Sequence, residues 1–84
     1  MTEQDLENIK PAKTVDARGM ACPGPLLEAK KSIGTVAVGD TIEILSGDAS
    51  TKADLPRWAA KVGHEFLGAI SGDGFDRLFI TRKK

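Results

Sequence analysis

Alternating apolar and polar positions predict four extended segments. Ile42 and Ile44 fall on one side of an alternating run, as in a strand with one buried face. The last two extended runs are joined by Gly72-Asp73-Gly74, a glycine-rich junction typical of a hairpin. The strands are expected at residues 14–17, 41–46, 64–71 and 75–82.

Two other segments follow the period of a helix. In the segment from Pro23 to the capping Gly34, the apolar positions recur at Leu26, Ala29 and Ile33. In the segment that ends at Gly63 they recur at Leu55, Trp58, Ala59 and Val62. Pro56 leaves two starts open for this second helix. Either Asp54 is the N-cap and Pro56 lies in the first turn, which we favour, or a helical turn begins at Ser50 and bends at Pro56.

The resulting order is βαβαββ. Two helices can cover only one face of four strands, so we expect an α/β (α+β) two-layer sandwich with a four-stranded mixed sheet and one open face. Leu78 and Ile80 are the candidates for the core side, and the open face would carry Leu45, Leu67 and Phe79. Residues 1–13 are polar and lack periodicity, which predicts a flexible tail ahead of a single domain over residues 14–84.

The composition of the chain argues against several classes of function. Twelve basic residues balance twelve acidic ones, so no net positive charge would attract nucleic acid or an anionic membrane. No run approaches the length of a membrane span, and the first residues lack the pattern of a secretory signal. A single cysteine in so small a domain indicates a reducing compartment, the cytoplasm. One cysteine and one histidine do not make a zinc or iron-sulfur site.

The lone cysteine, Cys22, comes at the start of the first predicted helix. With Cys22 as N-cap, Pro23 takes the first helical position and Pro25 the third, where missing N–H groups are tolerated. The positive end of the helix dipole favours a thiolate, the nucleophilic form of cysteine. Gly24 puts no side chain in the way of a sulfur donor, and Arg18 is a candidate contact for the sulfur or an anionic substrate.

Each candidate residue also has a structural interpretation. A lone cysteine is commonly an inert small apolar residue. His64 is expected to be a surface histidine at a strand start rather than a base for Cys22, and Trp58 a core residue. Asp16 would accept hydrogen bonds from loop amides around Gly19 and hold the cysteine loop in shape.

The run from Val15 to Pro25 resembles a known signature, Asp-x-x-Gly-x-x-Cys-Pro-x-Pro, of the TusA or SirA-like family of sulfur carrier proteins. Five residues match it: Asp16, Gly19, Cys22, Pro23 and Pro25. The resemblance covers about residues 14–84 and continues through Gly39-Asp40, Asp48 with Thr51, Asp54-Leu55-Pro56 and His64-Glu65. Gly24 departs from the pattern, since a polar or charged residue is usual there.

The resemblance implies a sulfurtransferase that acts as a protein co-substrate. Cys22 would hold a sulfane sulfur as a transient persulfide, with no other cofactor and no metal. Asp16, Gly19, Pro23, Gly24 and Pro25 would support the cysteine loop, and Arg18 would contact an anion or a partner. The implied donor is a cysteine desulfurase or rhodanese-like protein, and the implied acceptor is of the DsrE/TusD-like type. The sulfur would serve sulfur oxidation, for example from thiosulfate, tRNA thiolation or molybdenum cofactor synthesis.

Two other functions stay open. The expected architecture is similar to that of ribosome-associated initiation-factor domains, which suggests an RNA-binding module. Zero net charge and four aromatic residues argue against it, because RNA binding needs a basic surface and stacking platforms. The third alternative is an adaptor whose open sheet face binds a partner and whose thiol is incidental.

Overall fold

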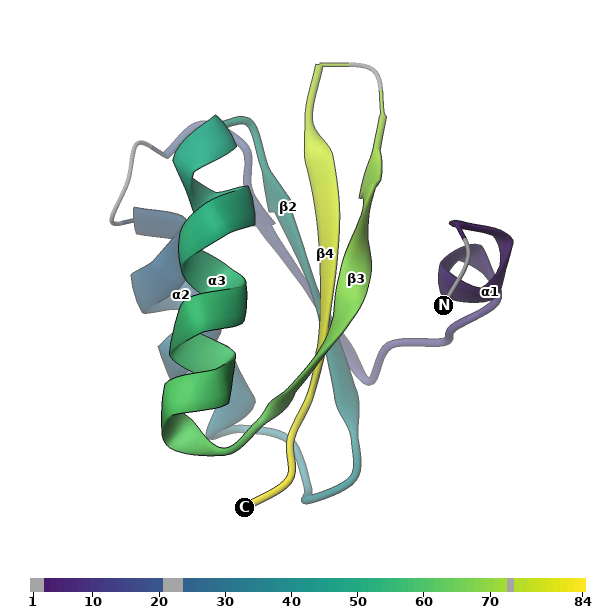
Figure 1. The fold of residues 1–84 in the computed structure, drawn as a ribbon, viewed down its shortest axis with the longest axis vertical. Coiled ribbons are helices and arrows are strands. Elements are labelled where there is room, and N and C mark those ends of the chain that lie inside the picture. Colours follow the sequence, from purple (N-terminus) through teal and green to yellow (C-terminus); the bar gives the residue numbers. More distant parts are fainter. Residues whose placement is uncertain (1–2, 21–23, 73) are drawn as a thin grey trace.

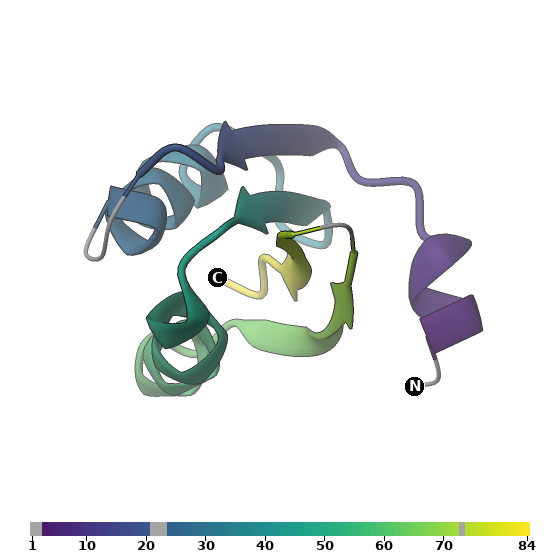
Figure 2. The same ribbon diagram turned by 90° about the horizontal axis from the view of Figure 1, so that it is seen from above.

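The computed structural model describes residues 3–20, 24–72 and 74–84. Figures 1 and 2 show two helices, α2 and α3, on one face of a four-stranded sheet and a short helix, α1, on the other. The elements are α1 (Glu3–Glu7), β1 (Lys13–Ala17), α2 (Gly24–Ile33), β2 (Thr41–Ser46), α3 (Ala49–Val62), β3 (Glu65–Ser71) and β4 (Asp76–Thr81).

The sheet has the strand order β1-β2-β4-β3 and is mixed. β1 pairs with β2 in parallel, whereas β4 pairs antiparallel with both β2 and β3. The predicted βαβαββ sandwich with a mixed sheet is therefore confirmed, and α1 precedes it. Because the parallel pair needs a crossover, α2 links β1 to β2 across one face, and α3 returns along that same face to β3.

The main core lies between the sheet and the two long helices. Paired strands align apolar side chains, so that Val15 lies beside Ile44 and Ile44 beside Leu78. Leu55 and Ala59 of α3 are buried against this layer. The remaining members of the buried cluster are Ala17, Ala29, Ile33, Ile42 and Ile80. The predicted inward facing of Leu78 and Ile80 is confirmed.

The second long helix begins earlier than we favoured. α3 starts at Ala49 with Asp48 as its N-cap, and Pro56 lies inside it, so the prediction of Asp54 as the cap is wrong. The Asp48 carboxylate accepts a hydrogen bond from the Ser50 amide (2.9 Å). The buried hydroxyls of Ser46 and Thr51 bond each other at 3.1 Å and tie the first turn to the end of β2. These contacts stabilise the additional turn in spite of the N–H that Pro56 lacks.

Removing the cap should therefore weaken α3. We expect Asp48→Ala to lower the free energy of unfolding by about 0.5–2 kcal/mol, because the Ser50 amide loses its acceptor. Asp48→Asn retains an acceptor oxygen and should cost much less. Urea denaturation of the two variants beside the wild type checks this, and equal losses for both would contradict the capping role.

Glycines close α3 and the hairpin as predicted. Gly63 has a φ of 86° at the C-cap of α3, and its amide donates to the Ala59 carbonyl. At the β3–β4 junction the Gly72 amide donates to the Phe75 carbonyl (2.7 Å), and Gly74 has a φ of 81°. Asp73 lies outside the described residues. The antiparallel pairing of β3 with β4 confirms the hairpin.

The N-terminal segment differs from the expected tail. Glu3–Glu7 is helical, and Leu6 is only 3% exposed because it packs against Ile70 and Phe79. The predicted facing of Phe79 is confirmed, but its side chain is covered rather than open to solvent. The two apolar residues of this segment, Leu6 and Ile9, are too few to show a helical period in the sequence. They become a buried pair only because β3 and β4 present an apolar surface.

Candidate functional site

The Cys-Pro-x-Pro motif lies between the end of β1 and the start of α2. The Met20 amide donates to the Ala17 carbonyl (3.1 Å), which closes a turn directly after β1. α2 begins at Gly24, two residues beyond Cys22 in the sequence. Cys22 and Pro23 lie outside the described residues, and so does the prediction that they are the N-cap and the first residue of the helix. Met20 and Gly24 therefore bound the site.

Pro25 and Gly24 shape the helix start. Pro25, the second residue of α2, is buried, which anchors the first turn against the core. A Cβ added at Gly24 would lie 2.9 Å from the Met20 Cβ. The missing side chain at Gly24 thus lets Met20 pack over the helix start. The sequence analysis did not predict this contact between Gly24 and Met20.

The charges along α2 favour an anion at its start. Its first turn contains no acidic side chain, and Lys30 and Lys31 occupy its last turn. The lysines complement the negative end of the helix dipole, and nothing in the first turn opposes a negative charge at the positive end. This helix start therefore favours a negative group placed beside it.

An ion pair braces the turn before the cysteine. The Asp16 Oδ1 accepts from the Arg18 amide (3.2 Å) and from Nε (2.9 Å), and Oδ2 accepts from Nη2 (2.7 Å). Arg18 Cζ also lies 5.0 Å from the centroid of the Phe75 ring. Asp16 therefore bonds a loop amide beside Gly19, in keeping with its predicted scaffold role. Arg18 was predicted to contact an anion or a partner, and that stays a prediction: its side chain pairs with Asp16 and lies over Phe75 but is 49% exposed.

The ion pair has a measurable signature. Hydrogen bonds from Arg18 lower the pKa of Asp16 from 3.8 to about 2. We expect Arg18→Ala to return this pKa toward 3.8, which an NMR titration of the carboxyl group checks. Because the folded-state pKa is depressed, any stabilisation by the pair is present above pH 3.8 and is lost as the pH falls through about 2. An unchanged Asp16 pKa in the variant would contradict the pairing.

The loops that contain Arg18, Gly47 and Gly74 lie close to one another. A Cβ at Gly47, directly after β2, would lie 3.0 Å from the Arg18 carbonyl oxygen and 3.9 Å from that of Gly74. A side chain at position 47 would be tight against the carbonyl of Arg18, so glycine suits this close approach. The patterns in the sequence did not predict this contact.

Two exposed apolar side chains flank the motif. Met20 is 41% exposed and Leu27, in the first turn of α2, is 55% exposed. Leu27 falls outside the apolar period of its helix, which was the sequence signal for its exposure. Apolar side chains beside a reactive group are suited to contact with another protein.

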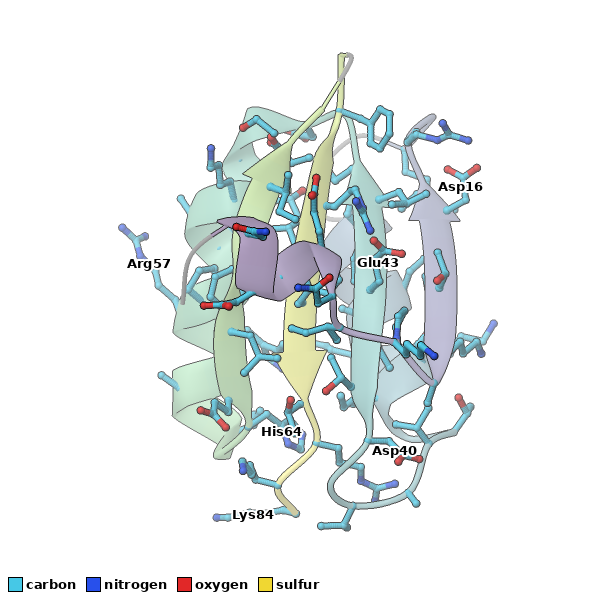
Figure 3. The ribbon with its side chains drawn as sticks, turned by 90° about the vertical axis from the view of Figure 1, so that its right-hand side faces the viewer. Asp16, Asp40, Glu43, Arg57, His64 and Lys84 are labelled. Atoms are coloured by element: carbon cyan, nitrogen blue, oxygen red, sulfur yellow. The ribbon has the colours of Figure 1, made fainter. Side chains whose placement is uncertain are left out.

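His64 is remote from the motif. Figure 3 shows Asp16 and His64 at opposite ends of the sheet. The Nδ1 of His64 accepts from the Lys83 amide (3.2 Å), and its ring centroid lies 5.7 Å from that of Trp58. Burial, and then the nearby Arg82 and Lys84, lower the pKa of His64. That His64 is no base for Cys22 stays a prediction, because Cys22 is outside the described residues, whereas the core role of Trp58 is confirmed by its packing against the main core.

Membrane-spanning and metal-binding features can be assessed over residues 3–20, 24–72 and 74–84. Within these ranges no helix combines the length and apolar character needed to cross a membrane. The same part of the chain contains no cluster of three potential metal-ligating side chains.

Comparison with known proteins identifies the family. Residues 13–82 match the family model described as Sulfurtransferase TusA. A protein of Archaeoglobus fulgidus is 41% identical over 70 residues, which make up 83% of this chain and 96% of the relative. The protein named Sulfur carrier protein TusA of Pseudomonas entomophila is 35% identical over 71 residues, 84% of this chain and 88% of the relative.

A solved structure shares the fold. The crystal structure of a SirA-like protein from Desulfitobacterium hafniense superposes with a TM-score of 0.75 and 24% identity, covering 86% of this chain and 99% of that one. The fold of this chain therefore recurs in that protein. Together with the match over residues 13–82, these relatives show that the chain belongs to the TusA family of sulfurtransferases.

Proposed function

We propose that the chain is a sulfur carrier that takes up sulfane sulfur as a persulfide on Cys22 and delivers it to a cysteine of an acceptor protein. The observation that carries this proposal is the single cysteine in a Cys-Pro-x-Pro motif directly before α2, in a chain of the TusA family. A second cysteine in the same chain would discharge the persulfide as an internal disulfide, and this chain has only one.

The chemistry balances without an outside oxidant or reductant. The Cys22 thiolate attacks the outer sulfur of a donor persulfide, the S–S bond of the donor breaks, and the donor thiolate leaves. In the second step the acceptor thiolate attacks the outer sulfur of the Cys22 persulfide. That S–S bond breaks and returns the Cys22 thiolate. With thiosulfate as the donor, the leaving group of the first step is sulfite.

The surroundings of the motif support both steps. The start of α2 favours a negative sulfur, as attack and departure require. Asp16 and Arg18 pair in the turn that follows β1, and exposed Met20 and Leu27 would offer apolar contacts to a donor or acceptor protein. Arg18 is half exposed, and the guanidinium N–H groups that do not bond Asp16 would contact an anionic donor.

Donor, acceptor, pathway and compartment belong to the same proposal. A cysteine desulfurase or a rhodanese-like protein presents the persulfide that the first step consumes, and a DsrE/TusD-like protein supplies the acceptor thiol. The delivered sulfur would enter sulfur oxidation, tRNA thiolation or molybdenum cofactor synthesis. A carrier that works through one reduced thiol needs a reducing compartment, and the cytoplasm provides it.

Intact-mass spectrometry tests the proposal. After incubation with thiosulfate, polysulfide or a charged donor protein, the wild-type mass should increase by whole sulfur atoms, and reduction should remove them. Cys22→Ala should gain none under the same conditions. A wild-type protein that stays unmodified with every donor would contradict the proposal.

A further inference from the structure

The N-terminal segment covers part of the sheet face opposite α2 and α3. We call Leu67, Ile70 and Phe79 the apolar strip. Leu6 of α1 packs on Ile70 and Phe79, while Ile9 and Leu67 border the contact. In Figure 3 α1 crosses in front of the sheet on the same face as Glu43 and Asp16. The strip is therefore filled by the protein's own chain.

The apolar strip accommodates one side chain of α1 above Gly68. β3 is irregular between Phe66 and Gly68. A Cβ added at Gly68 would lie 2.9 Å from the Leu6 Cδ1. Leu6 thus occupies space that a side chain at residue 68 would otherwise fill.

The helix of the covering segment would not be stable on its own. α1 has five residues, and isolated helices this short are unstable in water. Its last turn continues through bonds from the Asn8 amide to the Gln4 carbonyl (3.2 Å) and from the Ile9 amide to the Leu6 carbonyl (3.1 Å). The segment is therefore helical because it is bound to the strip.

The cover and the strip belong to different parts of the chain. The family match begins at residue 13, so it includes the strip but leaves α1 out. The Ala12 amide donates to the Thr41 carbonyl (2.7 Å), which anchors the chain directly before β1. Residues 3–9 can thus leave the sheet without disturbing the strand pairing behind this anchor.

We propose that the apolar strip is a docking site for a short amphipathic helix with two apolar side chains one turn apart. In the resting protein residues 3–9 occupy the site as a removable cover. Leu6 and Ile9 supply the two apolar side chains, as anchors do in other helix-in-groove complexes. A partner helix with the same pattern would bind by displacing the cover.

Side-chain contacts run from the docking site to the end of the sheet at which β1 finishes. Arg77 Cζ lies 5.5 Å from the Phe79 ring centroid, and Arg77 is paired with the buried carboxylate of Glu43. Two residues before Arg77, Phe75 contacts Arg18 in the turn that precedes the motif. A partner helix in the strip would thus lie on the face whose contacts extend to Arg18, in the turn that follows β1. This link to sulfur transfer rests on the proposed function, whereas the docking site itself does not.

Replacing Leu6 by a charged residue in the full-length protein tests the proposal. We expect Leu6→Asp to leave the fold intact by circular dichroism, while hydrogen exchange becomes fast in residues 3–9. A synthetic peptide of residues 1–12 should then bind the variant saturably, with NMR shifts in β3 and β4. The wild type should bind it at least about tenfold more weakly, because its own segment fills the site. Gln4→Asp, which adds the same charge at an exposed position of α1, should behave as the wild type.

Each other outcome overturns the proposal. If Leu6→Asp unfolds the domain, α1 is an integral part of the core and not a cover. If the peptide fails to bind Leu6→Asp, or if a peptide carrying Leu6→Asp binds it equally well, the strip is no docking site for such a helix. Loading of sulfur on Cys22 is measured separately on the same samples, so that failure of the docking site and failure of the carrier function are distinguished.

Discussion

We expect Cys22→Ser to abolish sulfur transfer. Serine is close to cysteine in size and is an accepted N-cap residue, so the variant should fold as the wild type does. Its hydroxyl forms no persulfide, so neither uptake nor delivery can occur. The expected result is complete loss of function in a strain whose growth depends on this protein, at an unchanged protein level by immunoblot.

The same experiment separates the carrier from the adaptor alternative. An adaptor would need its surface and not its thiol, so a strain carrying Cys22→Ser would grow normally. Gly24→Ala is a useful companion variant, since it retains the thiol and disturbs only the packing of Met20 over the helix start. It should retain the ability to be loaded.

The second large effect concerns stability. Leu78 is fully buried at the centre of the main core, between its neighbour Ile44 on β2 and the long helices. We expect Leu78→Ala to lower the free energy of unfolding by about 2–5 kcal/mol, through lost burial and the cavity left behind. Urea or thermal denaturation measures this loss. It is a large share of the roughly 5–15 kcal/mol that holds a typical domain folded.

Leu27→Ala is the matched control. It removes the same atoms from a leucine that is 55% exposed, and leaves no cavity in the core. It should change stability by less than about 0.5 kcal/mol. Equal losses for the two variants would contradict the placement of the core between the sheet and the long helices.

Short periodic patterns predicted most of the fold. The alternation around Ile42 and Ile44 placed β2 at Thr41–Ser46, the bounds that the structure gives. A strand with one face on a core must alternate, so local sequence carried this information. The signature around Cys22 likewise identified the candidate site, because a thiol, two prolines and a helix start are adjacent in the chain.

Contacts between distant segments account for what the sequence did not predict. Arg18 lies over the ring of Phe75, which is far away in the chain. Leu6 is buried only because β3 and β4 form a surface for it. In each case the deciding partner appears only when the sheet is assembled.

The central claim is that Cys22 both accepts and surrenders sulfur, and one transfer experiment tests it most directly. The protein is loaded with radiolabelled sulfane sulfur, separated from the donor, and mixed with an acceptor thiol protein. We predict that the label first maps to the peptide containing Cys22 and then moves to the acceptor, leaving the Cys22 thiol free. Label found on the chain away from Cys22, or label that stays on Cys22 with every acceptor, would contradict this claim.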